Sequence, residues 1–186
     1  MVKLRVVILL VIFSLVCKNI YENVTITLAY QKQNKVISYI EDYTFWDTEY
    51  EEKTEYVVDE YIGYIEVPSL KIRNLIKEGT NKFVLDKNYV GYVKHTAFLN
   101  SEEGNIVLAG HNNKYVFGPL HKISIGDIIN INDKIDNKIF KVVEKYEIDE
   151  TDLSVFDSIK DNLQLTLITC TNIDKKRLIV VGELSK

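Results

Sequence analysis

The chain has 186 residues, of which 46% are hydrophobic and 27% are charged, and its formal net charge is −4. These values indicate one folded domain with a modest additional segment, and they exclude a disordered or collagen-like chain. No run of lysine and arginine alternates with aromatic residues, so nucleic acid is not expected as a partner. Twelve tyrosines, with many isoleucines, valines and threonines, favour strands over helices.

Residues 1–17 are predicted to form an N-terminal membrane anchor. Lys3 and Arg5 precede an uncharged apolar run that begins at Val6. This run of about 12 to 15 residues is shorter than the roughly 20 that usually cross a bilayer, so the two basic side chains would have to reach toward the headgroups. No cleavage site is evident, and basic residues stay in the cytoplasm, so the C-terminal body is expected outside the cell. The alternative is a buried strand or helix.

Residues 18–60 are predicted to be an acidic stalk or linker. Positions 41–60 hold nine acidic residues against one lysine, which is typical of a solvated charged segment. A short helix around residues 36–40 is the regular element expected there. The carboxylates do not have the spacing of a calcium loop, so no metal site is predicted.

Residues 61–186 are predicted to form an all-β domain with short helices. Seven or eight short strands with turn residues between them indicate a closed or nearly closed β-barrel. A helical turn and a short strand are expected within residues 81–98, and a loop or short helix at 115–123. The other expected strands are residues 61–67, 71–77, 105–110, 128–131, 138–148, 163–170 and 178–184.

Three residues are candidates for a catalytic site. Cys170 ends a predicted strand, His111 directly follows another, and Arg177 opens the strand after Cys170. A thiol attacks as the thiolate and gains from a neighbouring base, and an imidazole can take its proton and later protonate a leaving amine. A guanidinium, which is always charged, can bind the oxyanion that forms or hold the substrate backbone.

Other interpretations of these residue types stay open at this point. A lone cysteine in a strand is often a small core residue, so Cys170 could be a buried structural thiol in a surface domain without catalytic activity. A thiol–imidazole metal site is a third possibility, which scattered ligands support poorly. Cys17 lies in the apolar N-terminal run, so a disulfide with Cys170 is not expected. His95 and His121 are expected to be surface or packing residues.

The motifs in this order resemble those of the sortase family, the cysteine transpeptidases of Gram-positive-type cell surfaces. The pieces that carry the catalytic resemblance are TLITC at 166–170, LAGH at 108–111 and the downstream Arg177. The resemblance covers about residues 61–184, and its further pieces are GYIEVPSLKI at 63–72, LIKEGT at 75–80, GNIVLAGHNN at 104–113 and FGPLHKISIGDIININD at 117–133.

The resemblance implies a closed eight-stranded barrel and cleavage of an LPxTG-like sorting signal, with no cofactor. Carried over by motif, Cys170 is the nucleophile, His111 the general acid/base and Arg177 the residue that binds substrate or oxyanion. Thr169 would help to hold the oxyanion or the sorting signal. The implied partners are surface proteins with a C-terminal sorting signal and an amine acceptor, which is either a peptidoglycan precursor or a pilin.

The subtype stays open. The short connection at 149–162 argues against members with a long inserted helix, and no Asp-Pro-aromatic triplet precedes Tyr61, so a pilin-type lid is not evident.

Overall fold

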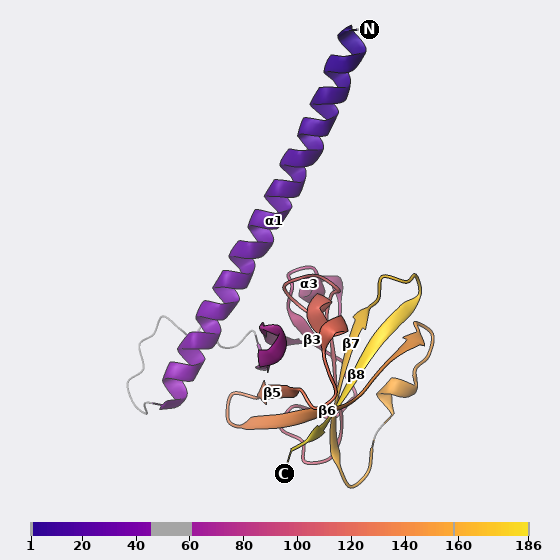
Figure 1. The fold of residues 1–186 in the computed structure, drawn as a ribbon. Helices are drawn as coiled ribbons and strands as arrows, with labels where there is room; N and C mark the ends of the chain where they lie inside the picture. Colours follow the sequence, from indigo (N-terminus) through magenta and orange to yellow (C-terminus); the bar gives the residue numbers. More distant parts are fainter. Residues whose placement is uncertain (1, 46–60, 158, 186) are drawn as a thin grey trace.

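The computed structural model describes residues 2–45, 61–157 and 159–185, with side chains of the N-terminal helix described for 7–38. A long helix, α1 (Val2–Phe45), precedes a β-barrel, and the N-terminal half of α1 projects beyond the barrel (Figure 1). The acidic run at 46–60, which holds much of the predicted stalk, lies outside the described residues.

Eight strands close into a barrel in the order β1-β2-β3-β4-β7-β8-β6-β5. Most neighbouring pairs are antiparallel, whereas β2 with β3 and β4 with β7 are parallel. The strands are β1 (Gly63–Val67), β2 (Ile72–Glu78), β3 (Val90–Tyr92), β4 (Gly104–Ala109), β5 (Ile128–Asn132), β6 (Asn137–Asp149), β7 (Leu163–Cys170) and β8 (Lys176–Leu184). The all-β class and the closed eight-stranded barrel expected from the sequence are therefore confirmed.

Four short helical segments lie in the connections of the barrel. They are η1 (Pro68–Leu70), α3 (Lys82–Leu85), η2 (Gly118–Lys122) and η3 (Ser154–Phe156). The helical turn expected within 81–98 is α3, and the loop or short helix expected at 115–123 contains η2. The connection between β6 and β7 contains η3 as its helical segment among the described residues, so no long inserted helix is present there.

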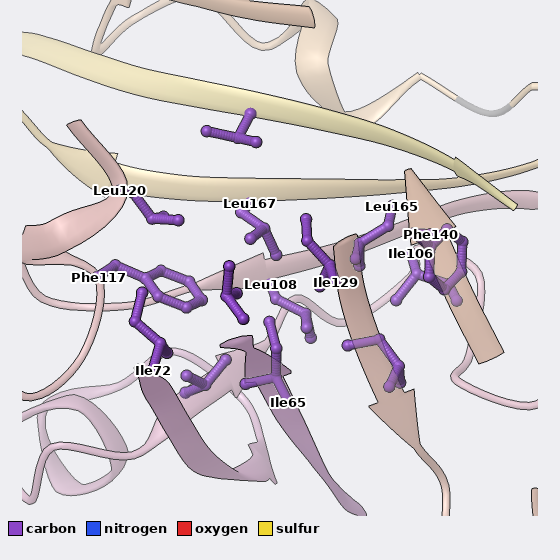
Figure 2. Close-up of a cluster of buried hydrophobic side chains, with 14 of the residues drawn as sticks. Ile65, Ile72, Ile106, Leu108, Phe117, Leu120, Ile129, Phe140, Leu165 and Leu167 are labelled. Atoms are coloured by element: carbon purple, nitrogen blue, oxygen red, sulfur yellow. The ribbon is translucent and has the colours of Figure 1, made fainter. Parts of the chain in front are cut away.

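The barrel interior is filled by one cluster of buried apolar side chains, which every strand supplies. Alternate residues of each strand point inward, as Leu165 and Leu167 do from β7 and Val180 does from β8. Phe117 and Leu120, around η2, also enter this core, as Figure 2 shows beside Leu108 and Leu167. The segment that follows His111 is therefore fixed to the barrel core by fully buried side chains.

The second half of α1 packs on the outside of the barrel, which differs from the solvated stalk expected for residues 18–40. Ile37 is fully buried and forms a cluster with Tyr61, Tyr64 and Leu75. Gln33 is also buried, where its amide donates to the Asn88 carbonyl (3.2 Å) and accepts from the Leu75 amide (3.3 Å). The short helix expected at 36–40 is thus part of a much longer helix.

Tyr115 makes the other main contact with α1. Its hydroxyl hydrogen-bonds with Thr27 (2.5 Å), and its ring lies 5.5 Å from that of Tyr30. Hydrogen bonds from Thr27 and Lys114 lower the pKa of Tyr115. Because Tyr115 belongs to the loop between His111 and η2, α1 directly contacts the loop that carries a predicted site residue.

Candidate active site

Cys170 and Arg177 are direct neighbours across the β7–β8 pair. Cys170 is the last residue of β7, and the antiparallel register pairs it with Arg177, the second residue of β8. Paired residues of a sheet point to the same face, so the thiol and the guanidinium lie on one side of the barrel wall at its rim. Cys170 is exposed, and both it and Cys17 are free.

His111 lies at the same end of the barrel, two residues after the end of β4, the strand beside β7. Strands β4 and β7 are parallel, with Ala109 paired to Ile168, and the Gly110 amide extends the ladder by donating to the Ile168 carbonyl (3.0 Å). His111 and Cys170 stand two positions beyond that last pair. The three predicted residues therefore lie in, or directly after, three adjacent strands, in the spatial order β4, β7, β8.

Gly110 allows two core side chains to approach the backbone directly before His111. A Cβ atom built on Gly110 would lie 2.7 Å from Phe117 Cδ2 and 2.8 Å from Val116 Cγ1, closer than side chains tolerate. The glycine therefore lets the core residues after His111 pack against the end of β4. The backbone N–H groups of Asn113 and Phe117 both donate to the His111 carbonyl, at 2.9 and 3.0 Å. These two bonds bring the ends of the 111–117 loop together.

A cleft of about 430 Å³ opens beside Cys170. It lies between η2, β6 and the connection that follows β7, and an Asn112–Asn172 hydrogen bond (3.3 Å) joins its two loops. His111 and Arg177 do not line this cleft, although Arg177 is paired with Cys170 in the sheet and His111 follows β4, which neighbours β7. The lining residues are Asn112, Gly118, His121, Lys145, Tyr146, Glu147, Thr169, Cys170, Thr171, Asn172, Ile173 and Leu178.

Thr169 faces the opposite way from Cys170. It belongs to the inward series with Leu165 and Leu167, is 3% exposed and lines the cleft. Its hydroxyl oxygen has no hydrogen-bond partner among the described residues. Buried hydroxyls are usually paired, so this group has hydrogen-bonding capacity to spare beside the thiol.

Two further side chains define the polarity of the cleft. Burial, together with the charges of Glu144 and Asp152, raises the pKa of Tyr146, so its hydroxyl stays protonated and can donate. The Lys145 ammonium donates to the carbonyls of His121 (3.2 Å) and Ile123 (2.8 Å). These hydrogen bonds hold it in the wall of the cleft.

Arg177 binds a carboxylate in this structure. Its guanidinium contacts Glu150 at 2.8 Å and also donates to the Lys176 carbonyl (3.2 Å). Both side chains are partly exposed, at 30% and 39%, so the pair is open to exchange with another anionic or carbonyl group.

Two residues near the site were missed by the sequence analysis. His121, expected to be a surface or packing residue, lines the Cys170 cleft, and its Nδ1 is 2.5 Å from the Gly118 carbonyl. Asp86 lies 3.3 Å from His111 Nε2. Neither follows a long strand, so periodicity could not align them with Cys170. His95 is exposed, as expected.

The other interpretations of Cys170 are not supported. A buried structural thiol is inconsistent with the exposed position of Cys170 at the rim. Among the described residues, no three histidine, cysteine, aspartate or glutamate side chains gather as metal ligands.

A closed eight-stranded barrel with a cysteine, a histidine and an arginine at one end is the arrangement that the sequence resemblance to sortases implied. Residues 65–185 match the sortase domain family. Sortase A of Listeria monocytogenes is 37% identical over 136 residues, which is 70% of this chain and 60% of that protein. The chain belongs to the sortase family.

Solved structures agree with this assignment. The crystal structure of Listeria monocytogenes sortase A has a TM-score of 0.63 at 35% identity, over 69% of this chain and 89% of that one. The Clostridium perfringens sortase D5 transpeptidase has a TM-score of 0.67 at 26% identity and covers 85% of this chain and 99% of that one. The chain thus spans about 60% of the length of the Listeria relative but nearly all of the solved sortase domains.

Proposed function

We propose that this chain is a membrane-anchored cysteine transpeptidase. It cleaves an LPxTG-like sorting signal on surface proteins and joins the protein to an amine of a peptidoglycan precursor or of another protein such as a pilin. The observation that supports the proposal is the pairing of Cys170 with Arg177 across β7 and β8, with His111 following β4, the other neighbour of β7, in a chain of the sortase family.

In the first half of the reaction, Cys170 attacks the carbonyl carbon of the threonine of the signal. His111 takes the thiol proton, so that the thiolate is the nucleophile. The C–N bond then breaks, and His111 gives the proton to the departing amine. The product is a thioester between the cargo protein and Cys170.

In the second half, the acceptor amine attacks the thioester carbonyl. His111 accepts a proton from the amine, the C–S bond breaks and the sulfur leaves as the thiolate, which is reprotonated. A new amide bond links cargo and acceptor. The reaction exchanges one amide for another, so it needs no oxidant and no cofactor.

Arg177 and Thr169 are proposed to hold the substrate. Each half of the reaction forms a negatively charged oxygen, which requires fixed donors. The Arg177 guanidinium can supply them by leaving Glu150, with which it forms a partly exposed pair. The unpartnered Thr169 hydroxyl, which is buried beside Cys170, is available to bind the oxyanion or the backbone of the signal.

The anchoring role is supported by α1. The helix contains one candidate membrane span by length and composition, and its residues 7–24 are all exposed. Eighteen helical residues extend about 27 Å, close to the thickness of a bilayer core. Lys18 and Glu22 pair at 3.9 Å within that segment. With Lys3 and Arg5 in the cytoplasm, the barrel would lie outside the cell.

The test uses the full chain in detergent with an LPxTG-type peptide and a small amine. Mass spectrometry should detect a thioacyl adduct on Cys170 and a peptide–amine product. The Cys170→Ala variant should form neither. A product that persists in Cys170→Ala, or an unmodified wild-type chain across a peptide library, would refute the proposed function.

A further inference from the structure

His111 contacts a carboxylate that belongs to none of the three site strands. Its Nε2 atom lies 3.3 Å from Oδ1 of Asp86, and the two side chains are 42% and 63% exposed. An exposed pair of this kind adds little to stability. Its effect on the imidazole is different, because the contact occupies one ring nitrogen and leaves the other free.

The chemistry of the pair determines which nitrogen carries the proton. A carboxylate can only accept hydrogen bonds, so a neutral imidazole in contact with it must donate through Nε2–H. Nδ1 then keeps its lone pair and becomes the nitrogen that can accept a proton. His111 follows β4, the strand beside β7, which ends at Cys170, so in the proposed reaction Nδ1 is the atom that takes the thiol proton.

Hydrogen bonds at both ends of α3 fix the turn that carries Asp86. Asn81 caps α3 by accepting from the Val84 amide (3.1 Å), and the Asp86 amide donates to the Lys82 carbonyl (2.9 Å) at the other end. Asn88, two residues later, has the left-handed φ of 62° and is 8% exposed.

A partly buried pair of side-chain amides, Asn88 and Asn113, joins this turn to the His111 loop. The Asn113 amide donates to the Asn88 side-chain oxygen at 2.7 Å, and Asn113 Oδ1 accepts from the amides of Tyr115 (2.9 Å) and Val116 (3.2 Å). Asn88 and Asn113 each stand two residues after a member of the Asp86–His111 pair. The pair is therefore supported by a short polar network under it.

We propose that Asp86 is a positioning residue that holds His111 in the tautomer with Nε2 protonated and Nδ1 basic. The inference rests on the proposed function of His111 as acid/base. When Nδ1 takes the thiol proton, both ring nitrogens carry hydrogen and Nε2–H keeps its contact with Asp86. When Nδ1 gives its proton to the leaving amine, the original tautomer returns.

The test combines kinetics with the ring nitrogen shifts of His111. Asp86→Ala should lower kcat about tenfold with little change in KM, since general acid–base catalysis contributes about 10²–10⁴ and a misoriented base loses part of that. Asp86→Asn keeps an acceptor oxygen at the same reach, so it should lose less. The matched control is Glu78→Ala, which removes the similarly exposed pair with Lys94 (3.0 Å) and should leave kcat unchanged.

The ¹⁵N chemical shifts of His111 supply a readout that is independent of turnover. In the wild type Nδ1 should show the shift of an unprotonated nitrogen, and in Asp86→Ala it should move toward the mixed-tautomer value, with Asp86→Asn close to the wild type. An unchanged Nδ1 shift, or an unchanged kcat in an active enzyme, overturns the inference. If the wild type transfers no peptide at all, the proposed function fails, and the shifts alone decide the role of Asp86.

Discussion

Cys170 and His111 stand at the ends of neighbouring strands, but they are held in different ways. Cys170 and Arg177 sit in a two-stranded ladder whose register runs unbroken from Gln164–Glu183 to Cys170–Arg177. His111 lies just beyond its ladder, in a loop held by the Asn88–Asn113 pair, by Phe117 in the core and by α1 through Tyr115. The thiol is thus positioned by backbone pairing, and the imidazole by side chains from distant parts of the chain.

Substitutions in the β7–β8 pair that carries Cys170 and Arg177 should lower activity strongly and change the melting temperature little. Arg177→Lys keeps the charge but loses the planar fork, so kcat/KM should fall about 100-fold, in line with the loss of an oxyanion donor. The melting temperature should stay within about 2 °C, because the Arg177–Glu150 pair is partly exposed. Peptide-transfer kinetics and a thermal melt measure the two effects.

Lys176→Ala is the control for Arg177→Lys. It removes the neighbouring exposed pair with Asp149 (2.8 Å) at the start of the same strand. Its kcat/KM should stay within about twofold, because an exposed pair of this kind adds little. A lysine variant at 177 that retained most of the activity would mean that bare charge is sufficient and that the fork has no role.

A substitution that disturbs the loop carrying His111 should lower both the stability and the activity of the protein. In Gly110→Ala the new methyl would meet Phe117 and Val116 below 3 Å, so the segment after His111 must shift. We expect a cost of about 1–3 kcal/mol in unfolding free energy and a loss of at least tenfold in kcat, since small misplacements of catalytic groups are costly. Denaturant unfolding and kinetics test this. A fully active alanine variant would show that the loop has freedom that its packing does not suggest.

Asn113→Ala tests the contribution of the Asn88–Asn113 polar network alone, because it leaves the core side chains of the loop unchanged. It would leave the buried Asn88 side chain and the partly buried Tyr115 backbone amide without these partners, at a cost of about 1–3 kcal/mol. For a chain of this length that corresponds to about 2–12 °C in melting temperature. Asn112→Ala is the control, because Asn112 is exposed and makes one 3.3 Å hydrogen bond. Equal melting temperatures for the two variants would contradict the network.

The same contrast explains which parts of the molecule the sequence could predict. Alternation, apolar runs and turn residues gave bounds for seven of the barrel strands and placed the short eighth, β3, within 81–98; β7 was predicted at 163–170 as observed. Cys170, His111 and Arg177 were found because each ends, follows or opens such a strand. Asp86 and His121 reach the site through irregular segments, and their neighbours are set by tertiary packing.

The packing of the N-terminal helix α1 on the barrel also could not be predicted from the sequence. The apolar run at 6–17 could be recognised by composition, whereas the docking of residues 26–37 could not. Gln33 and Ile37 are buried by a barrel surface that exists only once β1 and β2 have paired, so nothing local in residues 18–40 distinguishes a docked helix from a solvated one.

Gln33→Ala should have the smallest effect, and it tests whether α1 supports the loop side of the site at all. The substitution removes the hydrogen bonds to the Asn88 carbonyl and from the Leu75 amide but leaves Ile37 in its cluster. Amide exchange at Leu75 should accelerate, and kcat should fall about twofold to threefold through the Asn88–Asn113 network, each lost hydrogen bond being worth about 0.5–1.5 kcal/mol. Gln31→Ala, an exposed glutamine two residues earlier in the same helix, is the matched control. If both variants exchange and turn over like the wild type, α1 is an anchor alone, and the barrel positions His111 without it.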